Sequence, residues 1–488
     1  MEQGSLSPSR IVEVISITQD KMKSKAKPTH GFEECLKEVL PQVELVRELC
    51  QVPSVSLGAL HKGEMSCHST GYRDPEMIEK ACPDTIYMLS SCSKMFASAA
   101  MGILVDAQNV DWQDAIPKIL PKFCPTQDPQ IGESADFIDL LRHLSGLGEA
   151  GRLFLGPTEQ ISDQRFNEFV KDHILRPLRM TRTIMTRAEV HANANFATPC
   201  LTLGNELYNL HGHKYFESST SSTRLINSNN PLKQMNRIPR GYWTRPADDP
   251  STIRGAAYYM GWFRLDLPSS MLGAFSGNTL SHEKDSQNYL MPEFMLGKSS
   301  DSLLAIGHSG GMPGSLATIW TSLETDSAIL VLTNGRGLGD ASDFVAQTLI
   351  QQLFDLKPRF NLKPENARAL EQKIIPDDSM RAPESYVGKY EGCNGLLNLH
   401  ILMNDTDDLC TILNGRRSSK SSLIPFSRDI YSYFIPDFDT CMSRGIAMSK
   451  FEQTLLEFNF EEAGSVSIGL WWLWNSGEER GYFRKISS

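Results

Sequence analysis

The sequence predicts a mixed α/β (α+β) fold in which helices flank an antiparallel sheet, followed by a small all-β domain. Residues 303–335 contain successive runs that alternate between apolar and polar side chains, as paired strands do. Apolar residues recur at helical spacing in residues 32–49 and 340–354, on either side of those strands. From residue 386 onward, short strand-like runs alternate with turns, which is typical of a small antiparallel barrel or sandwich.

The same patterns divide the chain into four segments. Residues 1–30 are predicted to be a flexible N-terminal segment, and residues 31–357 the main α/β domain. Residues 358–384, rich in Pro, Asn, Lys and Asp, are predicted to be a linker, and residues 385–488 the β-barrel or sandwich. The aromatic run at residues 471–474 favours packing in the core and at the edge of a strand over a ligand-binding platform.

The main domain is expected to begin with a helix and a hairpin. Within the helix at residues 32–49, Pro41 predicts a break or a second start, because proline removes a backbone donor and clashes with the preceding turn. Residues 52–74 are typical of two strands that reverse direction at Lys62-Gly63.

Three more helical signals follow the hairpin. One helix is expected from about Ser91 and ends before Asn109. Two further signals lie at residues 111–123 and 135–144, and a glycine closes the second. Residues 202–250 then turn to Ser, Asn, Thr and Pro, which predicts an exposed loop or a flexible cover.

Composition argues against several function classes. The 488-residue chain has a formal net charge of −10 and a pI near 5.6, which disfavours nucleic acid or an anionic membrane as a partner. No run approaches the roughly 20 apolar residues of a membrane span. The first residues lack the apolar core of a signal peptide, and the ten cysteines form no C-x-x-C pair or zinc-ligand spacing. We therefore expect a cytoplasmic protein that needs neither a metal nor an organic cofactor.

The first candidate site is the tetrad Ser91-Cys92-Ser93-Lys94. A separation of three residues puts the Ser91 hydroxyl and the Lys94 amine on one helical face, where they can touch. A partly desolvated lysine can take the proton of a serine, and a helix N-terminus favours a developing oxyanion. In the alternative, structural interpretation, Ser91 caps the helix and Lys94 is solvated.

The second candidate site is His308-Ser309-Gly310-Gly311, which follows a strand-like run. Gly310 and Gly311 free the backbone to approach a ligand closely. His308 is a candidate to hydrogen-bond a substrate carboxylate or another polar group. The alternative is an ordinary loop histidine beside a turn.

Taken in order, these features resemble the class C β-lactamase and D-alanyl-D-alanine carboxypeptidase superfamily of serine β-lactamases and penicillin-binding proteins, including its esterase and transesterase branches. The resemblance extends from Phe32 to Phe354, and the C-terminal segment resembles the accessory domain of some members. The phrases that carry it are residues 52–74, 90–123, 136–147, 169–183, 258–268, 308–320 and 328–335.

The resemblance implies a β-lactamase-like catalytic domain with an acyl-enzyme on Ser91 and with Lys94 as base or proton relay. It also implies an oxyanion hole made by the N–H groups of Ser91 and Gly311. Substrate contacts through His308 and Ser309 are implied as well, with Gly310 between Ser309 and Gly311.

One departure from the family concerns a tyrosine. Members place a Tyr-x-Asn or Tyr-x-Ser motif after the helix at residues 136–147, and its tyrosine shares the proton transfer with the lysine. Here no tyrosine occurs between Tyr87 and Tyr208, and Tyr208-Asn209 lies too late in the order to replace it. The short segment around residues 151–162 is a real divergence, a splice or gene-model error, or the mark of a protein retired from catalysis.

We therefore expect a serine hydrolase or acyltransferase that acts on a small intracellular ester, thioester or amide, such as a product of a secondary-metabolite pathway. Its partner is a small-molecule acyl substrate, and an acyl carrier or another biosynthetic protein is a further candidate partner. The alternative is a catalytically impaired protein that uses the fold as a ligand-binding or scaffolding module, because the Tyr-x-Asn loop is missing.

Overall fold

The computed structural model describes residues 32–120, 133, 135–142, 161–203, 206–210, 243–244, 257–269, 272, 278, 295–312, 314–337, 339–357, 359, 381–392, 395, 397–404, 407–416, 419–432, 455–461, 464–473 and 480–487. The chain forms two compact units. The first comprises Met1–Cys200 and Asn209–Pro364, and the second comprises Leu201–Tyr208 and Glu365–Ser488. The predicted N-terminal segment, and most of the predicted linker, lie outside the described residues.

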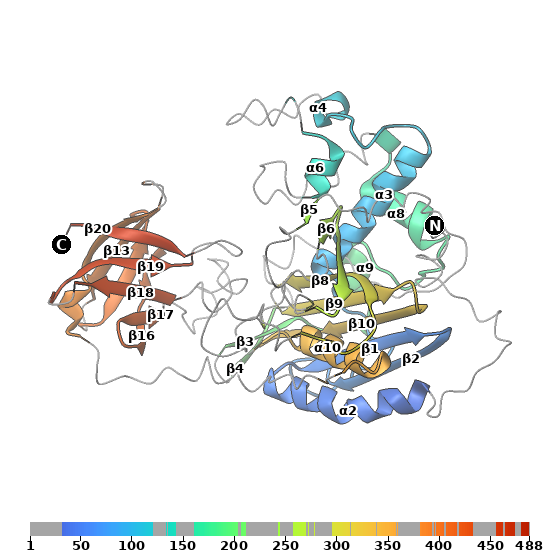
Figure 1. Cartoon of the computed structure of the whole chain (residues 1–488), viewed down its shortest axis with the longest axis horizontal. Coiled ribbons are helices and arrows are strands. Elements are labelled where there is room, and N and C mark those ends of the chain that lie inside the picture. Colours follow the sequence, from blue (N-terminus) through green and yellow to red (C-terminus); the bar gives the residue numbers. More distant parts are fainter. Residues whose placement is uncertain are drawn as a thin grey trace. The chain divides into compact units, whose positions relative to one another are not determined.

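The first unit is built on an antiparallel sheet. Its described strands are β1 (Ser54–His61), β2 (Glu64–Gly71), β5 (Trp243–Thr244), β6 (Ala257–Tyr259), β7 (Trp262–Leu267), β8 (Leu303–Met312), β9 (Ser315–Ser322) and β10 (Ser327–Thr333). They lie in the order β2-β1-β10-β9-β8-β7-β6-β5 (Figure 1). The N-terminal hairpin therefore lies beside the last strand of the sheet in sequence, and the predicted fold class is confirmed for this unit.

The predicted hairpin turn at Lys62-Gly63 is confirmed. His61 pairs with Glu64, so the two residues between them form the whole connection of β1 and β2. Lys62 has a φ of 51° and Gly63 a φ of 85°. Two positive φ values define a type I′ turn, whose twist matches that of the strands it joins.

Helices cover both faces of this sheet (Figure 1). α2 (Phe32–Leu49) and α10 (Ala341–Leu353) share one buried cluster with one face of the sheet. α3 (Lys94–Asp106) and α8 (Phe166–Val170) share another cluster with the opposite face. Successive side chains of a strand point to opposite faces of the sheet, so β1 contributes to both clusters. Leu57 joins the α2–α10 cluster, whereas Leu60 packs against the α3 cluster.

The prediction that Pro41 breaks the first helix is wrong. α2 is continuous from Phe32 to Leu49, and Pro41 lies on its exposed side. The inner face of the helix stays in register on both sides of the proline, with buried Phe32, Leu36, Val39, Val43 and Val46. Each buried aliphatic side chain contributes about 1.5–3 kcal/mol, which together outweigh the proline penalty of about 3 kcal/mol.

The other predicted helices are present in part. The 3-10 helix η2 (Ser90–Ser93) precedes α3, which ends before Asn109 as expected. The remaining described helices of this unit are α4 (Ile116–Ile119), α6 (Phe137–Leu141), the π-helix η3 (Lys171–Leu175) and α9 (Arg187–His191). α4 and α6 are shorter than the predicted ranges, parts of which lie outside the described residues. None of the described helices is long and apolar enough to cross a membrane.

Residues 202–250, predicted as an exposed loop, contain short strands. These are the end of β3 (Cys200–Leu203), then β4 (Glu206–Asn209) and β5. Nearly all other residues of this range lie outside the described part of the chain, so the predicted cover is not described.

The predicted small all-β domain is confirmed in the second unit. Its described strands are β12 (Gly388–Gly392), β13 (Leu397–Met403), β14 (Leu409–Leu413), β15 (Ser421–Ser422), β16 (Ile424–Ser427), β17 (Ile430–Ser432), β18 (Leu455–Phe460), β19 (Ser467–Trp472) and β20 (Gly481–Ser487). They form one sheet in the order β15-β14-β13-β12-β20-β19-β18-β17-β16. The two ends of this order, β15 and β16, are separated in sequence by Leu423 alone, so the sheet curls into a near-closed barrel.

Aromatic side chains fill the interior of this barrel. The largest of its buried residues are Tyr386, Tyr390, Tyr431, Phe458, Trp472 and Phe483. The neighbouring Trp471 points the other way, as alternation along β19 requires, and is 41% exposed. It lies against Tyr482, with ring centroids 4.9 Å apart. One tryptophan therefore packs in the core and the next on the surface of the strand.

Candidate active site

Ser91 and Lys94 lie at the junction of two helical segments. Ser91 is the second residue of η2, and Lys94 is the first residue of α3. Side chains three residues apart eclipse one another in a 3-10 helix, so this turn brings the amine over the hydroxyl. Lys94 Nζ donates to Ser91 Oγ at 2.8 Å. The position before α3 belongs to Ser93, so Ser91 is not the cap of that helix.

Ser90 holds this turn in an unusual conformation. Its φ is 52°, in the left-handed region that costs a non-glycine residue about 1–2 kcal/mol. Its Oγ is buried and, within the described part of the chain, has no hydrogen-bond partner. Strain of this kind persists only where the surrounding packing over-determines the backbone. The direction in which Ser91 leaves the turn is therefore fixed by packing.

Cys92 lies inside the tetrad and is fully buried. Burial raises the pKa of its thiol to about 12, although the charge of Lys94 acts in the opposite direction. The thiol is therefore neutral at pH 7 and does not compete with Ser91 as a nucleophile. Its Sγ lies 3.4 Å from the backbone oxygen of His308 and so connects η2 to β8.

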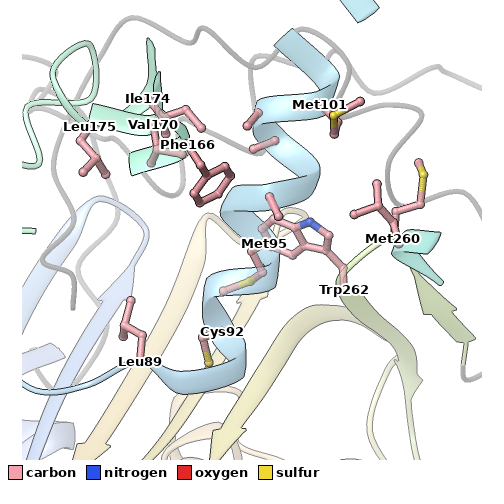
Figure 2. Close-up of a cluster of buried hydrophobic side chains, with 14 of the residues drawn as sticks. Leu89, Cys92, Met95, Met101, Phe166, Val170, Ile174, Leu175, Met260 and Trp262 are labelled. Carbon is pink, nitrogen blue, oxygen red and sulfur yellow. The ribbon is translucent and has the colours of Figure 1, made fainter. Parts of the chain in front are cut away.

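Core packing fixes the first turns of α3. Figure 2 shows the Met95 side chain of this helix with Trp262 of β7 beside the helix, and Phe166 and Ile174 approaching from the segment of α8 and η3. Trp262 Nε1 donates to Ser98 Oγ at 3.1 Å in a buried hydrogen bond. This bond ties β7 to the helix one turn after Lys94, so rotation of the helix would break it.

Strand β8 makes a close backbone approach to Ser91 at Gly310. A Cβ added at Gly310 would lie 2.2 Å from Leu89 O and 3.0 Å from Ser91 N. Both atoms belong to the backbone, so only glycine fits. β7 pairs with β8 as far as Gly307, whereas β9 continues to Met312. β8 therefore extends past β7 at the end that adjoins the Ser91 turn.

Ser309 and Gly311 flank this contact on the same strand. Ser309 pairs with Thr318, and Gly311 pairs with Leu316. A Cβ at Gly311 would meet its nearest neighbour, Leu316 Cδ2, at an ordinary 3.5 Å. Of the two adjacent glycines, it is thus Gly310 that the packing against Ser91 requires.

His308 lies within β8 and not in a loop. Its side chain is 5% exposed. Nδ1 contacts the backbone oxygen of Ser309, and Nε2 lies 3.4 Å from Tyr258 Oη. The ring of Phe263 is 4.7 Å away, measured between centroids. The imidazole is therefore enclosed by other parts of the protein.

The β6–β7 hairpin connects the two halves of the site. Gly261, in its turn, has a φ of 80°, and a Cβ there would lie 2.8 Å from Lys94 O. The same hairpin supplies Tyr258 and Phe263, which contact His308. A single element therefore sets the position of both Lys94 and His308.

Tyr87, the tyrosine nearest to Ser91 in the sequence, has a structural role. Its Oη lies 2.8 Å from Ser54 Oγ and accepts from Ser56 Oγ at 2.9 Å. Burial raises its pKa to about 12, although both hydrogen bonds act in the opposite direction. The hydroxyl therefore stabilises β1 from a fully enclosed position.

The sequence alone does not assign a role in the site to the residues of the β6–β7 hairpin. A glycine between pairs of aromatic residues indicates a tight turn, but spacing does not reveal that the turn contacts Lys94 and His308, which are remote in the chain. The short segment around residues 151–162, where the tyrosine loop of the family is missing, lies almost entirely outside the described residues. Tyr208 lies in β4, and its side chain is also outside them.

Comparisons with known proteins agree with this architecture. Residues 43–352 match the family model Beta-lactamase. No curated protein sequence matches the chain. The octameric penicillin-binding protein homologue from Pyrococcus abyssi has a TM-score of 0.51 and 15% identity, over 92% of this chain and 100% of that chain. D-alanine carboxypeptidase AmpC from Burkholderia cenocepacia has a TM-score of 0.50 and 13% identity, over 67% of this chain and 99% of that chain. At these identities the likeness concerns the fold alone.

Proposed function

Because the chain belongs to the beta-lactamase family, we propose that it is a serine hydrolase or acyltransferase that forms an acyl-enzyme on Ser91. The observation that carries the proposal is the 2.8 Å contact of Lys94 Nζ with Ser91 Oγ on one helical turn. The approach of Gly310 to Ser91 N adds support, because it brings a second stretch of backbone to the reacting group.

The proposed reaction has two steps with Lys94 as the proton carrier. In the first step Lys94, in the form that has lost its proton to solvent, accepts the Ser91 proton while Oγ attacks the acyl carbon. The bond to the leaving group breaks, and the leaving group takes the proton from the ammonium. In the second step water or another nucleophile gives its proton to Lys94 and attacks the acyl-enzyme, after which Ser91 regains its proton. The amine ends each cycle as it began.

The negative oxygen of each tetrahedral intermediate needs hydrogen-bond donors. We assign this role to the N–H groups of Ser91 and Gly311, as the family resemblance implies. Support comes from the adjacent Gly310, which packs on the Ser91 amide. Loss of one such donor typically lowers kcat by about 10²–10³-fold. Ser309 is assigned to contacts with the bound substrate on the same strand.

The acyl donor that we propose is a small ester, thioester or amide. The family includes esterase and transesterase branches, and the chemistry of Ser91 and Lys94 suits any of these acyl groups. The donor can arrive free or on an acyl carrier. A secondary-metabolite pathway, in which acyl groups are passed between small molecules, is the setting that we favour.

A fluorophosphonate probe tests the proposal, with the adduct measured by intact mass. We expect one adduct on the wild-type chain and none on Ser91→Ala. Lys94→Met keeps the nucleophile but removes its base, so labelling should slow by about 10²–10⁴-fold. Equal labelling of wild type and Ser91→Ala, or no labelling of either, would contradict the proposal.

A second candidate function is ligand binding or scaffolding without catalysis. The observation that favours it is the lack of a tyrosine between Tyr87 and Tyr208. The labelling experiment separates the two candidates, because a binding module has no need of an activated Ser91. Sequencing the transcript across the codons for Gly151 to Ser162 would establish whether the short segment is genuine.

A further inference from the structure

Ser98 places a hydroxyl in an otherwise apolar part of the core. It lies one turn after Lys94 on α3, is 0% exposed, and has Ala97 and Ala99 as its neighbours in the chain. Alanine would suit this position of the helix better, because it has the higher helix propensity and buries no polar group. A buried hydroxyl costs free energy unless it is hydrogen-bonded. Helix packing alone therefore does not account for a serine here.

The Ser98 hydroxyl both accepts and donates a hydrogen bond. It accepts from Trp262 Nε1 at 3.1 Å and donates to Met95 O at 3.1 Å. Bonds in such a chain polarise one another, and a buried environment strengthens them. Met95 directly follows Lys94, so the two bonds connect β7 to the first turn of α3, beside which Figure 2 shows the indole of Trp262.

The backbone holds Trp262 in place. Tyr259 pairs with Trp262, so only two residues form the turn between β6 and β7, and Trp262 is the first residue of β7. A two-residue connection fixes the register of a hairpin. The side chain of Trp262 is 3% exposed, so it is enclosed by the protein, as Ser98 is. Any effect of these two residues on a reaction must therefore act through other residues.

We propose that Ser98 and Trp262 are positioning residues, which hold α3 at the rotation that keeps Lys94 Nζ on Ser91 Oγ. Lys94 and Ser98 are four residues apart and so lie on one face of the helix. The bond from Trp262 opposes rotation of that face, and the 2.8 Å contact of Lys94 with Ser91 depends on this rotation. The inference rests on the proposed function, because it concerns the rate at which Ser91 is acylated.

Replacing either partner of the bond tests the proposal. Ser98→Ala removes the acceptor, and Trp262→Phe removes the donor. A displacement of about 1 Å in a catalytic group can lower a rate by about 10²-fold, and we expect fluorophosphonate labelling of Ser91 to slow by about 10–10²-fold in each variant. With 4-nitrophenyl hexanoate as substrate, kcat should fall while KM stays within about twofold of wild type, because neither buried side chain contacts the substrate.

The double variant Ser98→Ala/Trp262→Phe separates positioning from stability. Ser98→Ala leaves the buried Trp262 N–H without its acceptor, whereas the double variant contains no such donor. We therefore expect the losses of stability in the two single variants, measured by urea denaturation, to be less than additive. Labelling should stay as slow as in the slower single variant, because the bond is absent from all three. Labelling rates that simply follow the order of the urea midpoints would contradict a positioning role.

Trp112→Phe is the matched control. Trp112 is 4% exposed in the same buried cluster, and within the described part of the chain its Nε1 has no hydrogen-bond partner. Both tryptophan changes remove the same atoms from this cluster, but only Trp262→Phe breaks a bond to α3. We expect labelling of Trp112→Phe at the wild-type rate.

Two kinds of failure can be told apart in this series. Labelling of Ser98→Ala at the wild-type rate, or equal slowing in Trp112→Phe and Trp262→Phe, would overturn the positioning role and leave the proposed function intact. A wild-type chain that is not labelled on Ser91 would overturn the proposed function, and the positioning role with it.

Discussion

Single residues around the nucleophile combine a local contact with local strain. The Ser91–Lys94 contact arises within one turn, so a spacing of three residues was sufficient to predict it. The left-handed conformation of Ser90 could not be predicted in this way, because serine is not a residue that favours positive φ. The backbone of the preceding residue, Leu89, packs closely against Gly310, which lies far along the chain, and such a contact cannot be predicted from the local sequence.

Replacing Ser90 tests this strain. Ser90→Gly removes a penalty of about 1–2 kcal/mol and adds chain entropy worth about 0.5–1 kcal/mol, so the free energy of unfolding should rise slightly or stay the same. Ser90→Val should lower it by at least about 1 kcal/mol, because a β-branched side chain tolerates this φ poorly. Urea denaturation measures both.

The control for this series is Ser93→Gly. Ser93 has a φ of −64°, so glycine there relieves no strain and should lower the free energy of unfolding by about 0.5–1 kcal/mol. If Ser90→Gly destabilises the chain as much as Ser93→Gly does, the left-handed conformation is not a source of strain.

At the scale of elements, the β6–β7 hairpin supports the site from outside the two motifs. Its turn contacts Lys94 through Gly261, and its strand β7 bonds to α3 through Trp262. The hairpin thus fixes the position of α3, the helix that carries Lys94, relative to the sheet. Sequence pattern predicted elements whose partners are near in the chain, such as the turn at Lys62-Gly63, but not this long-range contact.

Gly261→Ala tests the hairpin's role. The added Cβ would strain a φ of 80° and would lie 2.8 Å from Lys94 O, so Lys94 must move. A displacement of about 1 Å in a catalytic group can lower a rate by about 10²-fold, and we expect fluorophosphonate labelling of Ser91 to slow by about 10–10²-fold. Labelling kinetics measure the loss, and circular dichroism checks that the fold remains.

Gly63→Ala is the matched control for this substitution. Gly63 has a similar φ of 85°, and a Cβ there would meet nothing within 4 Å. Both variants should lose a similar amount of stability through the backbone, but only Gly261→Ala should slow labelling. Equal labelling rates in the two variants would show that the hairpin does not position Lys94.

At the scale of the whole molecule, the sequence predicted both architectures but not every boundary within them. Alternating strands and a type I′ turn define the antiparallel sheet of the first unit, and short strands separated by turns define the barrel. The prediction at Pro41 was wrong because the free-energy cost of a proline within a helix is smaller than the free energy gained by burying the inner face of α2. That burial depends on the sheet that the helix covers, which the local sequence does not reveal.

The two units have separate buried clusters, which leads to a prediction about how they unfold. Leu470 is fully buried in the barrel cluster, and Val331 is fully buried in the α2–α10 cluster. Leu470→Ala should destabilise the second unit by about 2–5 kcal/mol, because it removes buried methyl groups and leaves a cavity. Calorimetry should then show an earlier transition for that unit, while the rate of Ser91 labelling at 25 °C stays unchanged.

Val331→Ala should destabilise the first unit and leave the second unit unchanged. It removes buried methyl groups from β10, which pairs with β1 and β9 in the sheet that carries the site. The transition of the first unit should move to lower temperature, and labelling should fall on warming before the barrel unfolds. A single transition that shifts equally in both variants, or a loss of labelling in Leu470→Ala at 25 °C, would mean that the two units unfold as one.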